Sequence, residues 1–386
     1  MTSKLEVHPS ARDLRFDSLR GLFLVCMTIN HLPTEMRNAT DQSLGVFSAA
    51  EGFVFLSGLI AGWVYTRKFR QFGAGGLWSS SENRANSIYR WHVGSLLAAF
   101  ACVQLTEHFL GFCSPAVPRL FFEHPLESLG LGVSLLYQPG LLDLLPMYCV
   151  FVMLLPMVIS ALESGRRGLV LGLSGAVWLA TQWAPPVDGA PLYPINTGSF
   201  NLFAWQFLFI VGVTIGHARI SGLQQALRPN RWVVAGAAAL SVYGFGLHHY
   251  QWPHPWPEHA FGILLNKPAL GLFRMADFGC VAYLVAIFGA RFPKALVWRP
   301  LAFLGQNSLA VVAAQSVTVM ALMQFNSLFD TGLSRTLTAA VVIGILFVVA
   351  GARQAVVSRG RSGAAPIGTR QPAARRLIRP DDARAA

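Results

Sequence analysis

The feature of this sequence that most limits how it can fold is a succession of apolar stretches, each about 20 residues long. As an α-helix, a stretch of this length crosses roughly 30 Å of hydrocarbon. Of the 386 residues, 53% are hydrophobic and only 12% are charged, which excludes an ordinary soluble domain. We therefore predict an all-α polytopic membrane protein, because a helix satisfies its own backbone hydrogen bonds in lipid.

The sequence predicts about ten transmembrane helices in one membrane domain, residues 14–352. The expected spans lie near residues 14–32, 44–66, 91–112, 142–162, 168–184, 200–218, 232–250, 268–290, 300–322 and 336–351. The first span follows a basic segment, residues 1–13, but it contains ionisable residues and lacks a small-residue cleavage site, so we interpret it as a retained helix. The tail, residues 353–386, is basic and poor in apolar residues, which predicts disorder.

The distribution of basic residues predicts the orientation in the membrane. Most of the 30 Lys and Arg residues lie in loops on the side of the N-terminus, whereas the opposite loops contain Arg37, Arg119, Lys267 and Arg335. By the positive-inside rule both termini are cytoplasmic, as expected for a multi-pass protein of a bacterial inner membrane. Loop topology and contact with membrane lipid then explain the net charge of +12, and no basic stripe with interleaved aromatic residues indicates nucleic acid.

The first span contains the strongest candidates for chemistry. Arg20 and His31 are eleven residues apart, which on an α-helix gives about 16.5 Å of rise and about 20° of rotation, so they share one face. Asp17 precedes Arg20 by three residues and is positioned to pair with it. Ionisable groups at membrane depth are costly and usually line a functional cavity or satisfy one another. We interpret His31 as a catalytic base and Arg20 with Asp17 as substrate-binding residues; the alternative for His31 is a packed structural histidine.

The start of the second span places further polar groups at a similar depth. We expect Glu51 to meet His31, where its carboxylate would accept the imidazole N–H and fix the tautomer of the catalytic base. The alternative is a helix-end carboxylate that reaches the membrane interface. Asn30 and Ser57 are candidates to bind substrate and stabilise an oxyanion, although neutral polar residues in membrane helices more often join neighbouring helices.

The other reactive residue types indicate neither a disulfide framework nor a metal. The five cysteines are scattered and show no metal-binding spacing. Four histidines near the outer face are flanked by Trp and Pro, which fits an interfacial belt or a sugar-stacking surface better than a metal site. They are His248, His249, His254 and His259. We expect no metal and no bound cofactor.

Several motifs along the chain resemble those of the OpgC branch of membrane acyltransferases, which are relatives of the acyltransferase-3 group. The matching elements are residues 12–21 (RDLRFDSLRG), His31, residues 51–58 (EGFVFLSG), residues 142–148 (LDLLPMY), residues 203–206 (FAWQ) and residues 303–309 (FLGQNSL). Together they cover most of the membrane domain. Arg20 and His31 match the Arg-x10-His element of the family, whereas Gln315 stands where many acyltransferase-3 relatives carry a second histidine.

The resemblance implies about ten helices, a cytoplasmic acyl-CoA donor, typically succinyl-CoA, and a glucan acceptor on the periplasmic side. The acceptor is either an osmoregulated periplasmic glucan or cellulose, in the second case with a polysaccharide synthase complex as a possible partner. In such a reaction a sugar hydroxyl is a poor nucleophile until a base with a pKa near neutrality removes its proton, and histidine suits this role.

Two other classes of function remain compatible with the sequence. A transporter or flippase for a glycan or an acyl carrier could use the same intramembrane charges as a relay. A non-catalytic scaffold of a polysaccharide synthase would not need them. Translocation of a substrate without a covalent product would favour the transporter.

Overall fold

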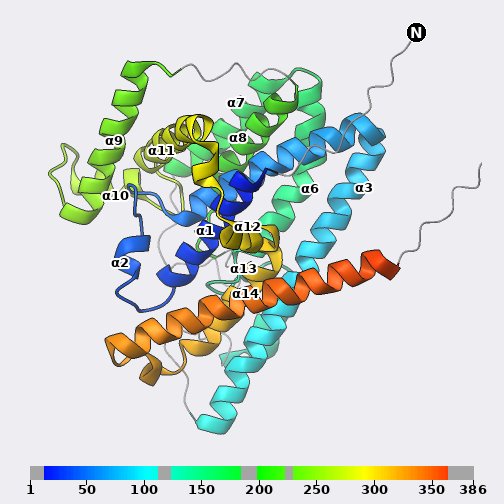
Figure 1. The fold of residues 1–386 in the computed structure, drawn as a ribbon, viewed down its shortest axis with the longest axis vertical. Helices are drawn as coiled ribbons and strands as arrows, with labels where there is room; N and C mark the ends of the chain where they lie inside the picture. Colours follow the sequence, from blue (N-terminus) through cyan, green and yellow to red (C-terminus); the bar gives the residue numbers. More distant parts are fainter. Residues whose placement is uncertain (1–12, 112–122, 184–197, 222–228, 364–386) are drawn as a thin grey trace, which may run out of the picture.

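The computed structural model describes residues 13–111, 123–183, 198–221 and 229–363, and within these ranges it contains helices and no β-strand. The prediction of an all-α fold is confirmed for this part of the chain (Figure 1). The helices are α1 (Leu14–Asn30), α2 (Arg37–Thr40), α3 (Ala49–Leu110), α5 (Pro125–Val133), α6 (Leu144–Glu163), α7 (Arg167–Trp183), α8 (Leu202–Ile220), α9 (Arg231–Tyr250), α10 (Glu258–Leu265), α11 (Leu272–Arg291), α12 (Arg299–Gln306), α13 (Ser308–Leu322) and α14 (Gly332–Gly363), with short 3₁₀ turns η1 (Pro293–Leu296) and η2 (Asn326–Phe329).

Five of the described helices are long and apolar enough to cross a membrane, namely α3, α6, α8, α11 and α14. The chain is therefore a membrane protein, while ten crossings are not confirmed and the orientation of the termini stays a prediction. The expected spans differ from the helices for physical reasons. With 17 residues, α1 is short and contains three charged side chains beyond its first residue, and the expected span 300–322 is broken at Asn307 into α12 and α13.

The helix α3 joins two of the expected spans. It is 62 residues long, and at Gly73 the backbone leaves the helical region with φ 67° and ψ −170°. Such a positive φ is readily adopted by glycine, which has no Cβ. Two arms of α3 therefore meet at an angle, and Figure 1 shows this bend. The bend brings the second arm against the first, where the Tyr65 hydroxyl donates a hydrogen bond to the Ser80 carbonyl at 3.5 Å.

Glycines allow α3 and α8 to pack with their backbones in contact. Gly58 and Gly62 on α3 face Gly212 and Gly216 on α8, and a Cβ at any of these four positions would overlap a backbone oxygen or a neighbouring backbone atom of the facing helix. The spacing of four residues on both helices is the small-xxx-small pattern of closely packed membrane helices. This contact forms the centre of the helix bundle.

We expect the substitution Gly62→Ala to destabilise the protein by about 1–3 kcal/mol, because the new methyl group overlaps the Val213 carbonyl oxygen. The control is Gly94→Ala on the same helix, where no atom lies within 4 Å of the added Cβ. Thermal unfolding in detergent measures both. Equal melting temperatures for the two variants would contradict a tight α3–α8 contact.

Charged side chains tie the helices together at the end of the bundle where α1 begins. Asp13 caps α1 and forms ion pairs with Arg15 at 2.7 Å and with Arg219 of α8 at 3.3 Å. Partial burial opposes ionisation of Asp13, but the hydrogen bonds from these guanidinium groups outweigh it and hold the pKa of Asp13 below its ordinary value. At the same end, Glu163 binds Arg70 at 2.8 Å and His217 at 2.9 Å, which joins α3, α6 and α8.

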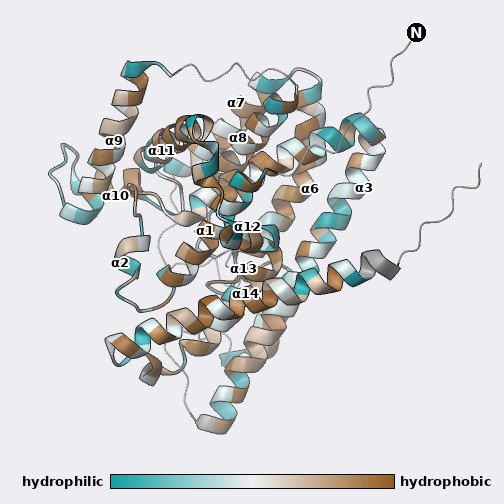
Figure 2. Cartoon of the chain, in the orientation of Figure 1, coloured by the Kyte–Doolittle hydropathy of each residue, from teal (hydrophilic) through white to brown (hydrophobic). Residues whose placement is uncertain are grey.

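The helix α14 lies at the edge of the bundle. Only 17% of its most apolar window is buried, compared with 67% for α3, and Figure 2 shows hydrophobic residues along it. An apolar helix that its neighbours leave uncovered fits a face turned toward lipid. The helix continues to Gly363, so the first part of the expected tail is helical, and the remainder of that tail lies outside the described residues.

Candidate active site

Glycines position α1 against α12 and thereby place Arg20. A Cβ at Gly21 would overlap the Leu301 carbonyl, and one at Gly305 would overlap the Asp17 carbonyl, so the two helices touch through their backbones. This contact brings the guanidinium of Arg20 to the Ser308 hydroxyl, to which it donates a hydrogen bond. The same guanidinium lies over the ring of Phe53, 5.4 Å from its centre. Arg20 is thus held between α12–α13 and α3.

Asp17, the predicted partner of Arg20, is buried with 2% of its surface exposed. It lies on the side of α1 that touches α12, since its carbonyl is the group that Gly305 approaches. The pairing of its carboxylate with Arg20 stays a prediction. A buried carboxylate beside α12 is consistent with a role in holding α1 in place.

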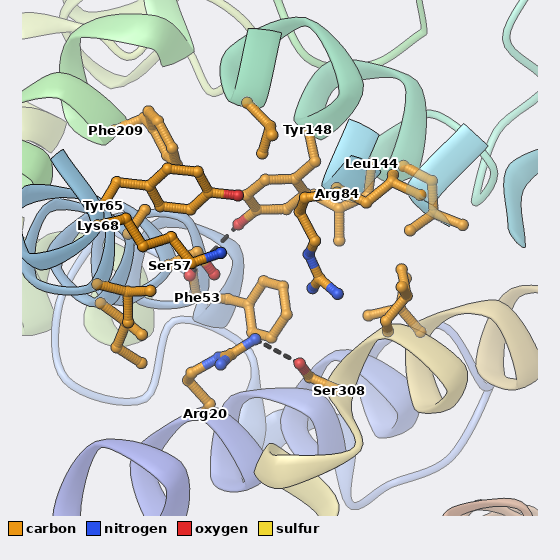
Figure 3. Close-up of a pocket in the computed structure, with 18 residues that line it drawn as sticks. Arg20, Phe53, Ser57, Tyr65, Lys68, Arg84, Leu144, Tyr148, Phe209 and Ser308 are labelled. Carbon is orange, nitrogen blue, oxygen red and sulfur yellow. Dashed lines mark hydrogen bonds between the residues drawn. The ribbon is translucent and has the colours of Figure 1, made fainter. Parts of the chain in front are cut away.

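A cavity of about 290 Å³ extends from Arg20 along the first arm of α3. Its lining includes seven positions of α3 between Phe53 and Lys68, spaced three or four residues apart or adjacent, which form one helical face. Fifteen residues of α-helix span about 22 Å, so the cavity is long and narrow. Side chains from α6, α8 and α13 close its other walls, and Figure 3 shows them directed into the same space.

The polar groups of this cavity are basic or neutral. Arg20, Lys68 and Arg84 contribute positive charges, and none of the described residues that line the cavity is acidic. Ser57 is part of the lining, and its side chain also interacts with the buried Tyr148 hydroxyl. Its role in binding substrate stays a prediction. The Tyr148 hydroxyl also donates a hydrogen bond to the Phe53 carbonyl at 3.3 Å. A positive, largely apolar cavity of this kind suits an elongated organic anion.

His31 lies at the opposite end of α1 and does not line this cavity. It is the C-terminal cap of the helix, its backbone is still helical with φ −92° and ψ −4°, and its side chain is exposed. The charges of Lys267, Arg37 and Asp41 are close enough to act on the imidazole.

Glu51 does not orient His31, and the prediction of this contact is wrong. Its Oε1 accepts a hydrogen bond from Nε of Arg274 in a pair whose side chains are 1% and 4% exposed, and its Oε2 accepts from the backbone and hydroxyl of Ser48 at 3.0 and 2.6 Å. Among the described residues, no hydrogen bond joins Glu51 to His31. Both carboxylate oxygens are occupied, because Glu51 is at once a helix cap for α3 and the counter-ion of a buried arginine.

Asn30 has a structural place next to His31. Its side-chain amide donates to the Thr40 carbonyl at 3.3 Å, and its oxygen accepts from the Thr40 hydroxyl. The loop after α1 is therefore folded back over the end of the helix, which brings Arg37 and Asp41 toward His31. A role of Asn30 in binding substrate stays a prediction.

Three of the four outer histidines, His248, His249 and His254, take part in ring contacts or hydrogen bonds. The rings of His254 and Phe261 lie 3.7 Å apart and nearly parallel, and His249 contacts the Gln42 carbonyl at 3.3 Å. No group of three or more His, Cys, Asp or Glu residues within the described ranges is arranged to hold a metal ion. Gln315 is buried in α13, 7% exposed.

Sequence reasoning misses four residues that shape this region: Ser308, Tyr148, Lys267 and Arg274. Ser308 and Tyr148 stand inside the quoted motifs 303–309 and 142–148, so those motifs are the available signal. In the sequence, Lys267 counts only as a loop charge and Arg274 only as a charge within a span. The partner of Arg274 is more than 200 residues away along the chain, and no spacing rule connects such positions.

Comparison with protein families gives a match over most of the chain. A family model described as OpgC protein matches residues 12–357, which includes the quoted motifs and both ends of the site. No curated protein and no solved structure matches the chain.

Proposed function

Because the chain belongs to the OpgC family, we propose that it is a membrane-bound acyltransferase that modifies a glucan. The acyl group moves from a thioester, acyl-CoA, to a hydroxyl of a glucose unit. The family resemblance favours a succinyl group. The donor is cytoplasmic and the acceptor, an osmoregulated glucan or cellulose, is on the periplasmic side of the inner membrane.

The observation that carries this proposal is the division of the site along α1. Arg20 stands at a positive, narrow cavity that Lys68 and Arg84 also line, whereas His31 stands at the other end of the helix, where the charges of Lys267, Arg37 and Asp41 act on it. A donor that enters from one side and an acceptor from the other therefore meet along a single helix. The acyl end of the donor has to extend beyond Phe53 and Val312 of the cavity to reach the imidazole.

The reaction assigns each group a chemical task. The imidazole of His31 removes the proton of a sugar hydroxyl as the oxygen attacks the thioester carbonyl. The new C–O bond forms, the C–S bond breaks, and the proton passes to the leaving thiolate. Arg20 and Ser308 bind the donor, and Ser57 contributes a hydroxyl to the cavity wall. No cofactor other than the donor substrate is needed.

Mass analysis of the periplasmic and surface glucans from strains with and without the gene tests this function. We expect an ester-linked acyl group that is present with the gene and lost without it. Its mass identifies the acyl group, and the glucan that carries it identifies the acceptor. Glucans that are identical in the two strains, together with transport of a glycan across the membrane by the purified protein, would contradict the proposal.

We expect Arg20→Ala to lower kcat/KM for the donor by about 10- to 100-fold, because a hydrogen bond to a charged group is lost. The kcat/KM of Arg20→Lys should lie between the values of Arg20→Ala and the wild type, since an ammonium keeps the charge but not the planar fork of the guanidinium. Arg90→Ala, at an exposed position of α3, is the control. A wild-type kcat/KM in the Arg20→Ala enzyme would show that Arg20 does not bind the donor.

A further inference from the structure

The cavity is too small to enclose a whole nucleotide thioester. Its volume of about 290 Å³ is at the lower end of the range of ligand pockets, and most of its lining is apolar. It suits a slender arm that bears the acyl group. The bulky, charged head of the donor then remains at the open end, where Val64 is 40% exposed and both Lys68 and Arg84 are half-buried.

Two cations line this end of the cavity, and the charge of a third acts on one of them. Lys68 and Arg84 line the cavity from the two arms of α3, which the bend at Gly73 brings together. The charge of Arg84 acts on Lys68 and also on Arg353 of α14. Like charges at short range repel one another, so this arrangement has a cost in the absence of an anion.

None of the three cations forms an ion pair with an acidic residue in the described part of the chain. Lys68 lies over the ring of Tyr65, 5.2 Å from its centre, and Tyr65 is also the neighbour of Arg84. By contrast, the nearby Arg70 and Arg219 are both paired with carboxylates. Basic side chains left without carboxylates, around the mouth of a cavity, are a binding site for a multiply charged anion.

We propose that Lys68 and Arg84, assisted by Arg353, bind the phosphate groups of the donor and so make the enzyme select phosphorylated thioesters. This inference rests on the proposed function and assigns the residues that recognise the donor head. Arg20, which lines the same cavity from α1, then contacts the slender arm of the donor or the acyl group. Phosphate groups of anionic lipids share this chemistry, and the experiment below separates the two sources.

The test compares two donors on the purified full-length protein in nanodiscs of zwitterionic lipid. One donor is an acyl-CoA, and the other is the same acyl group on pantetheine, which has no phosphate. We expect Lys68→Gln and Arg84→Gln each to raise KM for acyl-CoA by about 10- to 100-fold. The fall in kcat/KM should be larger for acyl-CoA than for the pantetheine thioester, which has no phosphate to bind. Lys68→Arg and Arg84→Lys should restore most of the affinity for acyl-CoA.

Arg67→Gln is the matched control, because Arg67 is adjacent to Lys68, exposed, and seated on the ring of Trp63 outside the cavity. Direct binding of CoA, measured by calorimetry, should weaken in the Lys68 and Arg84 variants and not in the control. If a glutamine variant does not fold, the wild type still tests the proposal, since its preference for acyl-CoA over the pantetheine thioester should decrease as salt screens the phosphates.

The outcomes separate this inference from the proposed function. Acyl transfer by the wild type, with unchanged CoA binding in both glutamine variants, would overturn the phosphate site and leave the acyltransferase intact. Loss of co-purified anionic lipid in the variants, with unchanged CoA binding, would assign the cations to lipid and also overturn it. CoA binding that depends on Lys68 and Arg84, without any acyl transfer, would support the site and contradict the proposed function.

Discussion

His31→Ala is expected to abolish measurable acyl transfer, with a loss of about 10²- to 10⁴-fold in turnover. A loss of this size is the usual contribution of a positioned general base. Within the described residues, no other imidazole lies at the end of α1 to replace that of His31. The effect should fall on kcat more than on KM for the donor, because the donor cavity does not include His31. Initial rates with labelled acyl-CoA measure both quantities.

The His31→Ala substitution should leave the stability of the protein unchanged. His31 is exposed and no hydrogen bond of its side chain is among the contacts of the described residues, so the alanine variant should unfold at the temperature of the wild type. His108→Ala, at another exposed histidine, on α3, should keep full activity. A folded His31→Ala protein with normal turnover would show that His31 is not the catalytic base.

Glu51→Ala is expected to destabilise the protein by about 3–5 kcal/mol, because it leaves the charge of Arg274 buried without a counter-ion. It also removes the cap of α3, since Glu51 accepts a hydrogen bond from the backbone of Ser48. The matched control is Glu35→Ala, which breaks the exposed pair with Arg335, and exposed pairs contribute about 0–1 kcal/mol. Chemical denaturation in detergent measures both.

A double variant separates the two roles that Glu51 could have. Glu51→Leu with Arg274→Met removes both charges, and well-packed apolar replacements of a buried pair are often neutral, so much of the stability should return. We also expect acyl transfer to return, because the main task of Glu51 is to balance the buried charge of Arg274, which this variant removes. A stable double variant without activity would show that the Glu51–Arg274 pair has a role in the reaction beyond stability.

The first helix of this region is an element that the sequence predicts well, since the expected span 14–32 corresponds to α1, Leu14–Asn30. The spacing of Arg20 and His31 places them on one helical face, and the structure has both on α1 and its cap. Local geometry alone decides this, since an α-helix has a fixed rise and twist. The division of the membrane domain into spans is less accurate, because hydropathy does not reveal whether two apolar segments are joined by a loop or by a bent helix such as α3.

The partner of Glu51 could not be derived from spacing, since Arg274 is 223 residues away along the chain. One local signal does point to the structural role. Ser48 and Glu51 have the spacing of a capping box, Ser-x-x-Glu, directly before an apolar run. The four-residue spacing of Gly58 and Gly62, repeated at Gly212 and Gly216, is likewise a sequence pattern that favours close contact between two membrane helices.

The basic mouth of the cavity depends on the bend of α3. With residues 67–90 interpreted as a loop, Lys68 and Arg84 count only toward the topology of the membrane domain. The bend at Gly73 instead places both on one cavity. Charge counts cannot distinguish a scattered set of loop cations from two cations that line one cavity. That arrangement depends on the packing of the two arms of α3.

The most direct test of the account uses proteoliposomes in which the protein has a single orientation. Acyl-CoA with a labelled acyl group is supplied on the side of Lys68 and Arg84, and a glucan oligosaccharide on the side of His31. We predict that the wild type forms a labelled ester on the glucan and that the His31→Ala protein forms none. Label on the glucan at equal rates in both proteins, or glucan that crosses the membrane without label, would contradict the account.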